Sequence, residues 1–236
     1  MKTILFDVDD TLYDQLEPFK KGLMDIFKDK LDESILTPDV VEKIFAVSRK
    51  YSDEVFEKTV TGEMSMDRMY IYRIKNALRE FGIRIDDRTS LNFQKHYLMH
   101  QNEIALSQDI EVLIKGLTKR GDIVGIVSNG PSVHQWNKIK KLQILELIPK
   151  RNIIISGDVG FSKPDLKIFR LAQKRMPSES KEYIFVGDSL DNDVEGAKKA
   201  GMITVWMNRR NHSIENKHPL PDYEVKSESQ LLKLLL

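Results

Sequence analysis

The chain has 236 residues, with 37 lysines and arginines against 36 aspartates and glutamates, and no cysteine. This length suffices for one large domain or two smaller ones with a buried core. A formal net charge of +1 offers no bulk attraction to nucleic acid or an anionic membrane, and the lack of cysteine excludes disulfides, thiolate metal sites and cysteine nucleophiles. We therefore expect a cytoplasmic protein with no nucleic-acid or membrane partner and no secretory signal, while the oligomeric state stays open.

The first predicted element is a short buried strand that ends in carboxylates. Residues 4–6 are apolar, and the sequence Asp-Val-Asp-Asp-Thr follows them directly. Because alternate side chains of a strand point to opposite faces, Asp7 and Asp9 can share one side while Val8 takes the other. Two carboxylates this close require a cation between them or a shared proton. A polar strand exit that caps a helix is the alternative for this segment alone.

A long stretch rich in helix formers separates the first predicted strand from the second. A crossover between parallel strands needs far fewer residues, and apolar positions recur here at helical spacing. We therefore predict an inserted all-helical cap domain over residues 17–94 and a core formed by residues 1–16 and 95–236. His96 and His100 have the i,i+4 spacing of some zinc sites, but no glutamate lies between them, which favours ordinary helix residues.

Four further short apolar runs resemble the first and predict the other strands. They are residues 123–127, 153–155, 183–186 and 203–206. Each is bounded by Gly, Asn or Asp and separated from the next by a helix-length stretch, which is the pattern of βα units. The predicted fold class is α/β, with a doubly wound, Rossmann-like parallel sheet as its core.

Polar side chains follow these strands as well. Ser128 and Asn129 come after the second strand and precede a helix expected to begin near Ser132, whose N-terminal N–H groups suit a phosphate. Lys163 directly precedes Pro164, a residue that can begin the next helix. The sequence thus predicts a hydroxyl, an amide and a cation at the same edge of the sheet.

Two more carboxylates follow the strand at residues 183–186. Ligands of doubly wound sheets bind at the carboxyl ends of the strands, so Asp188 and Asp193 should lie near Asp7 and Asp9. Hard oxygen ligands suit Mg²⁺ better than zinc, and Lys163 adds a further positive charge. Carboxylates, a divalent cation, a lysine, a hydroxyl and helix-end N–H groups together predict a site for phosphoryl transfer.

Three lysines lie on the helix predicted after Ser132. We expect Lys138, Lys140 and Lys141 to form one solvated helix face. With a net charge near zero, such a run does not indicate nucleic-acid binding.

In chain order, the polar strand exits resemble the four motifs of the haloacid dehalogenase superfamily. The likeness is carried by Asp7-Val8-Asp9-Asp10-Thr11, Ser128, Lys163, and Gly187-Asp188 with Asp193. The helical insertion between the first two motifs is similar to the cap of that superfamily's first subclass. The resemblance covers almost the whole core and implies a Mg²⁺-dependent phosphatase of small phosphorylated metabolites.

The resemblance also implies roles for the acidic residues. Asp7 would be the nucleophile that forms an aspartyl-phosphate, and Asp9 would protonate the departing oxygen and later activate water. Thr11 would orient Asp9. Mg²⁺ would be held by Asp7, the backbone carbonyl of Asp9 and Asp188, with Asp193 as a ligand or as support for the ligands.

For the phosphate group, the resemblance implies a set of polar residues around the nucleophile. This set consists of Thr11, Ser128, Asn129 through its backbone, and Lys163. Lys163 would also offset the negative charge of Asp7 and of the substrate.

The substrate prediction comes from details of the motifs. Dehalogenases have an aromatic residue where this chain has Asp9, and phosphonate-cleaving relatives lack a carboxylate there, so both activities are disfavoured. Asp10 replaces the frequent glycine, and residues 128–130, 159–164 and 206–208 look most like the pyrimidine 5′-nucleotidase group. We therefore predict nucleoside 5′-monophosphates as substrates. The alternatives are a sugar-phosphate phosphatase, a phosphosugar mutase, and a catalytically silent binding module.

Overall fold

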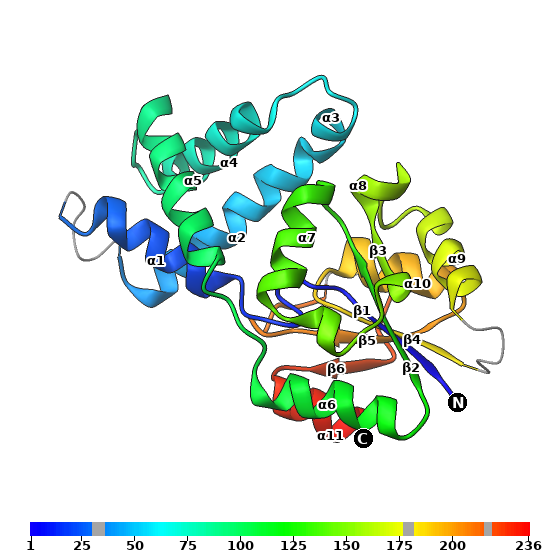
Figure 1. Cartoon of the computed structure of the whole chain (residues 1–236). Helices are drawn as coiled ribbons and strands as arrows, with labels where there is room; N and C mark the ends of the chain where they lie inside the picture. Colours follow the sequence, from blue (N-terminus) through cyan, green and yellow to red (C-terminus); the bar gives the residue numbers. More distant parts are fainter. Residues whose placement is uncertain (30–35, 177–181, 215–218) are drawn as a thin grey trace. The chain divides into compact units, whose positions relative to one another are not determined.

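The computed structural model describes residues 1–29, 36–176, 182–214 and 219–236. The chain separates into two compact units (Figure 1). Met1–Asp14 and Ala105–Leu236 form the first, which we call the core unit, and Gln15–Ile104 form the second, the helical unit.

These unit boundaries differ from the expected ones. The expected second boundary, between residues 94 and 95, falls inside the continuous helix α5 (Asp87–Gln101). Phe93 and Tyr97 of this helix pack against Phe19, with ring centroids 5.2 and 5.7 Å apart. Because these aromatic contacts tie the whole of α5 to its neighbour, the helical unit extends to the end of that helix and beyond.

The core unit is built on a six-stranded sheet with the order β3-β2-β1-β4-β5-β6, in which every neighbouring pair is parallel. The strands are β1 (Thr3–Phe6), β2 (Ile123–Ser128), β3 (Ile153–Ile155), β4 (Tyr183–Gly187), β5 (Ile203–Met207) and β6 (Tyr223–Val225). Five of them lie where the apolar runs predicted, which confirms the fold class. The short strand β6 was not predicted, because two of its three residues are exposed and give no apolar run.

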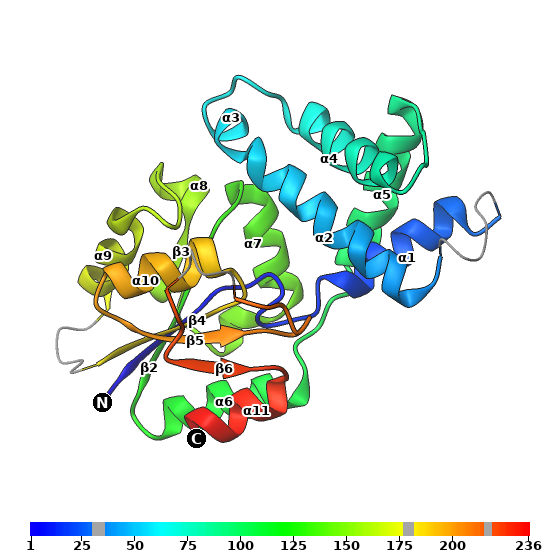
Figure 2. The same cartoon turned by 180° about the vertical axis from the view of Figure 1, so that it is seen from behind.

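Helices cover both faces of the sheet (Figures 1 and 2). The helices α6 (Gln108–Lys119) and α11 (Glu228–Leu235) lie together on one face, and α9 (Leu166–Arg175) and α10 (Glu195–Lys199) lie on the other. Alternate strand residues, among them Leu5, pack under α9 and α10 in one buried cluster. This packing on both faces fixes the strands whose carboxyl ends carry the polar residues.

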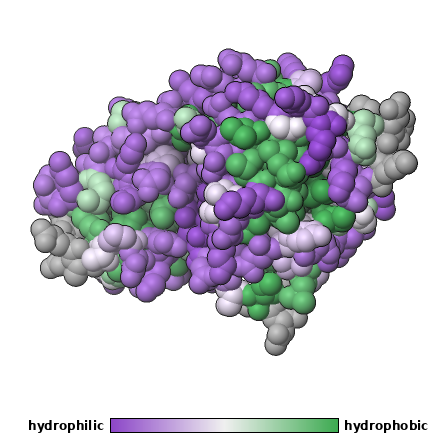
Figure 3. Space-filling view, turned by 90° about the horizontal axis from the view of Figure 1, so that it is seen from below, coloured by the Kyte–Doolittle hydropathy of each residue, from purple (hydrophilic) through white to green (hydrophobic). Residues whose placement is uncertain are grey.

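Seen from below, the core unit shows a group of hydrophobic side chains bordered by hydrophilic ones (Figure 3). The helices α6 and α11 lie on that side, and Val112, Leu234 and Leu236 from this part of the chain are exposed.

The remaining elements of the core unit connect the strands. They are α7 (Ser132–Lys141), η1 (Ile144–Glu146), η2 (Lys150–Asn152), α8 (Ser156–Val159) and the π-helical turn η3 (Leu190–Val194). The expectation that Pro164 begins the next helix is wrong. The helix α9 begins at Leu166, because the side chain of Asp165 caps it by accepting a hydrogen bond from the Lys167 N–H at 2.9 Å.

The helical unit contains five helices among its described residues. They are α1 (Leu16–Phe27), α2 (Pro38–Glu54), α3 (Phe56–Val60), α4 (Met66–Glu80) and α5. The apolar faces of α1, α2, α4 and α5 form one buried cluster that includes Phe19, Leu23, Ile44, Leu78 and Phe93. In the described part of the chain, no helix has both the length and the apolar character needed to cross a membrane.

Candidate functional site

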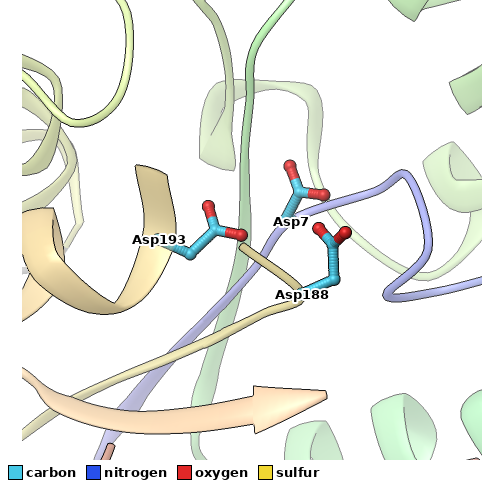
Figure 4. Close-up of side chains that lie close together, drawn as sticks. All are labelled: Asp7, Asp188 and Asp193. Atoms are coloured by element: carbon cyan, nitrogen blue, oxygen red, sulfur yellow. The ribbon is translucent and has the colours of Figure 1, made fainter. Parts of the chain in front are cut away.

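Three carboxylates meet at the carboxyl ends of β1 and β4. These strands are neighbours, with Phe6 opposite Val186, so the residues that follow them emerge side by side. Asp7 follows β1, Asp188 follows β4, and Asp193 lies on η3; each has a carboxylate oxygen within 4.8 Å of the others' (Figure 4). Asp7 and Asp193 are buried and Asp188 is half-buried. Such a group of hard oxygen ligands fits a divalent cation of the Mg²⁺ type.

The position of Asp193 depends on the glycine that ends β4. A Cβ atom at Gly187 would lie 2.3 Å from Oδ2 of Asp193, which leaves no room for any other residue without moving the carboxylate. The same oxygen accepts a hydrogen bond from the Ser189 N–H at 3.0 Å. Ser189 also caps η3, because its Oγ accepts from the Asn192 N–H at 3.1 Å.

Lys163 joins two of the carboxylates. Its Nζ lies 2.6 Å from Oδ1 of Asp7 and 2.7 Å from Oδ1 of Asp193, and all three side chains are buried. Burial alone would lower the pKa of Lys163, but the carboxylates of Asp193 and Asp7 outweigh it and raise the pKa above its usual range. Lys163 is therefore a permanent cation in the site.

The surroundings of Asp7 disfavour its charged form, because its pKa lies above the usual value for an aspartate. Burial raises the pKa of Asp7, Lys163 lowers it, and the negative charges of Asp193 and Asp9 raise it, so that the pKa moves from 3.8 to about 6. An ionised Asp7 is therefore costly here unless a further positive charge compensates it. The burial of this carboxylate beside two others thus also fits a bound cation.

The backbone around Lys163 is fixed by the loop after β2. The amide of Asn129 donates to the Lys163 carbonyl at 2.9 Å, and its Oδ1 accepts from the Lys163 N–H at 2.9 Å. The hydroxyl of Ser128 is buried and has no hydrogen-bond partner in the part of the chain that the structure describes. A buried hydroxyl without a partner costs free energy, so a ligand oxygen fits beside Ser128.

Asp9 is held by three side chains that the sequence did not indicate as its partners. Tyr13 donates to its Oδ1 at 2.5 Å, Gln135 donates to its Oδ2 at 3.0 Å, and Lys138 lies 2.7 Å from both oxygens. The expected orienting bond from Thr11 is not observed, since the Thr11 hydroxyl has no hydrogen-bond partner within the described ranges.

The expectation of a solvated face for the lysines of α7 is wrong for Lys138. Its side chain is only 4% exposed, because it pairs with Asp9, whereas Lys140 and Lys141 are exposed as predicted.

Two arginines from the loop after β5 hold the backbone that follows Asp9. Arg209 donates to the carbonyls of Asp10 and Thr11, both at 2.8 Å, and Arg210 donates to Oδ1 of Asp10 at 2.9 Å. Asp10 has a φ of 57°, in the left-handed region that favours glycine. The ion pair with Arg210 helps to hold Asp10 in this backbone conformation, at a position where the haloacid dehalogenase motif often has glycine.

The two histidines of α5 lie in the helical unit and pair with an aspartate of α1. Asp25 Oδ2 is 2.9 Å from Nδ1 of His96 and 2.7 Å from Nε2 of His100. The group of described residues that could hold a metal ion, at the ends of β1 and β4, does not include these two histidines.

The fold and the motif geometry define a class of protein that comparison with known proteins confirms. Residues 4–207 match the family of haloacid dehalogenase-like hydrolases, and the chain belongs to this family. The glyceraldehyde 3-phosphate phosphatase of Methanopyrus kandleri is 27% identical over 241 residues, which cover 100% of this chain and 97% of the relative. The N-acylneuraminate-9-phosphatase of Rattus norvegicus is 24% identical over 240 residues, which cover 100% and 94%.

A solved structure supports the same assignment. The magnesium-bound crystal structure of the putative HAD-hydrolase YfnB from Bacillus subtilis has a TM-score of 0.71 and 26% identity, and the match covers 99% of this chain and 98% of that one. The predicted enzyme class is thus confirmed at the level of the family. The chain is a hydrolase whose full-length relatives include phosphatases.

Proposed function

We propose that this hydrolase is a Mg²⁺-dependent phosphatase that cleaves small phosphomonoesters through an aspartyl-phosphate on Asp7. The observation that carries the proposal is the buried group of Asp7, Asp188 and Asp193 with Lys163 beside it. The group offers one carboxylate that can attack phosphorus, further oxygens for a cation, and a fixed positive charge. Its position at the carboxyl ends of parallel strands agrees with where ligands of such sheets bind.

In the first step, the substrate phosphate lies against the carboxyl ends of β1 and β2. Mg²⁺, when held by Asp7, Asp188 and Asp193, would supply positive charge that offsets the phosphate and keeps Asp7 ionised. Lys163 keeps Oδ1 of Asp7 paired and directed, and the free hydroxyl of Ser128 donates to a phosphate oxygen. Asp7 attacks phosphorus while Asp9 gives a proton to the departing oxygen.

In the second step, water attacks the phosphorus of the aspartyl-phosphate. Asp9, now ionised, accepts a proton from that water, and Asp7 leaves as a carboxylate. Inorganic phosphate is released and both aspartates return to their starting protonation states. The burial of Asp7 limits access of bulk water to the acyl-phosphate bond.

The substrate class that we favour is the phosphorylated sugars. The two phosphatases named above act on a phosphorylated sugar or sugar acid by their names, and both match the full length of this chain. The nucleoside 5′-monophosphates predicted from motif likeness become the second class. The substrate panel includes them because Asp10 and the loops after β2, β3 and β5 resemble the pyrimidine 5′-nucleotidase group.

The decisive experiment measures inorganic phosphate released from a panel of sugar phosphates and nucleoside monophosphates, with Mg²⁺ or with EDTA. We expect Mg²⁺-dependent release that is greatest for a sugar phosphate, and no release by Asp7→Asn. Isomerised sugar phosphate with little free phosphate would instead indicate a mutase. Turnover retained by Asp7→Asn would contradict the covalent mechanism.

A further inference from the structure

Helix α7 presents two buried polar side chains to Asp9. Gln135 and Lys138 are three positions apart, so they lie on one face of the helix, and they are only 2% and 4% exposed. A buried ammonium is costly unless it is paired and hydrogen-bonded. Lys138 meets that requirement by lying 2.7 Å from both oxygens of Asp9. Its burial is therefore explained by the carboxylate that it contacts.

Gln135 connects Asp9 to the loop that follows β2. Its Nε2 donates to Oδ2 of Asp9 at 3.0 Å and to the carbonyl of Asn129 at 2.5 Å. Asn129 in turn holds the backbone of Lys163 by two hydrogen bonds. A continuous set of direct hydrogen bonds thus fixes the Asp9 carboxylate relative to both the β2 loop and the lysine beside Asp7.

We propose that Gln135 and Lys138 are positioning residues, which hold the Asp9 carboxylate in the orientation needed for proton transfer to the departing oxygen. The inference rests on the proposed function, because it assigns a role to Asp9 in phosphoester cleavage. Gln135 at Oδ2 and Tyr13 at Oδ1 contact the carboxylate from either side of its Cβ–Cγ axis and so fix its plane. Lys138, at 2.7 Å from both oxygens, fixes where the carboxylate group lies. Proton transfer requires that orientation, and a small misplacement costs a large factor in rate.

The basicity of the departing oxygen gives a specific readout for this role. An alkoxide leaves only with a proton, while p-nitrophenolate is stable as an anion. A defect in the positioning of Asp9 therefore slows cleavage of an alkyl phosphate far more than cleavage of p-nitrophenyl phosphate. The ratio kcat/KM is the right quantity, because it covers the steps up to the departure of the leaving group. Loss of structure alone would lower both values equally.

The experiment compares Lys138→Met with the wild type on glycerol phosphate and p-nitrophenyl phosphate, with Mg²⁺ present. We expect kcat/KM to fall by about 100-fold for glycerol phosphate and by less than about fivefold for p-nitrophenyl phosphate. Lys138→Arg, which keeps a cation that can contact both oxygens, should recover part of the loss. The matched control is Lys141→Met, an exposed lysine on the same helix, which should leave both values unchanged.

Several outcomes would overturn the inference. Equal losses on both substrates, no loss on either, or faster cleavage of glycerol phosphate would each exclude a positioning role. If circular dichroism shows that Lys138→Met is unfolded, Gln135→Met carries the same comparison. A wild-type protein that releases no phosphate from either substrate would overturn the proposed function together with this inference, whereas an active wild type with equal losses in the variant overturns the inference alone.

Discussion

Replacing Asp7 by asparagine should stabilise the metal-free protein at neutral pH. The pKa of Asp7 is raised by burial from 3.8 to about 6. The folded state therefore holds a proton that the unfolded state has lost between these two pH values, and the free energy of unfolding falls as the pH rises through that window. A shift of this size corresponds to about 3 kcal/mol. Asp7→Asn removes the charge and keeps the shape, so it escapes this cost.

Urea unfolding in EDTA, followed by tryptophan fluorescence at several pH values, measures the effect. Both tryptophans, Trp136 and Trp206, belong to the core unit and report on its unfolding. We expect the stability difference between Asp7→Asn and the wild type to grow by about 2.5 kcal/mol between pH 4 and pH 7. Saturating Mg²⁺ should stabilise the wild type, by about 2.7 kcal/mol at 100 times its Kd, and should stabilise Asp7→Asn less.

A difference between Asp7→Asn and the wild type that stays constant from pH 4 to pH 7 would refute the argument from burial. A metal-free wild type that is more stable than Asp7→Asn at pH 7 would refute it as well.

Two further substitutions test the metal group and the helical unit. Gly187→Ala places a Cβ 2.3 Å from the Asp193 carboxylate, so Mg²⁺ affinity measured by calorimetry should fall at least about tenfold; an unchanged Kd would contradict the role of that glycine. In the helical unit, burial would lower the pKa of His100, but hydrogen bonds to Asp25 and Glu103 outweigh it and raise the pKa above 6.5. This contribution is complete below pH 6.5 and is lost as the pH rises through the raised pKa, so His100→Gln should cost less than about 1 kcal/mol at pH 6 and nothing at pH 9 in urea unfolding. Equal costs at both pH values would exclude the ion pair as the cause.

The meeting of Asp7, Asp188, Asp193 and Lys163 could be predicted from the sequence because it follows from topology. Carboxyl ends of parallel strands share one edge of a sheet, and β1 lies between β2 and β4. The side chains that contact Asp9 could not be predicted in the same way. The expectation that Thr11 orients Asp9 came from the family resemblance. Two of the observed partners, Gln135 and Lys138, lie on α7, and tertiary packing decides which face of that helix points toward Asp9.

The arginines after β5 show why contacts between residues far apart in the chain cannot be predicted from local sequence patterns. Arg209 and Arg210 lie about 200 positions along the chain from Asp10, and nothing in their own segment indicates that they contact it. Their role follows from the left-handed backbone of Asp10, which only the folded structure reveals. An aspartate in place of the frequent glycine did mark this position as unusual, although it did not identify the partner.

The burial of Lys138, by contrast, could have been predicted from the sequence, because this lysine lies at helical spacing from apolar residues. Gln135, Lys138, Ile139 and Leu142 occupy the i, i+3, i+4 and i+7 positions of one helical face, and all four are buried. Two apolar residues therefore fix the buried side of α7, and a lysine in that stripe requires a partner of opposite charge. The charge run suggested a solvated face because Lys140 and Lys141 fall outside this stripe and are exposed. The position of each lysine around the helix axis, rather than the density of charge, decides which lysine reaches Asp9.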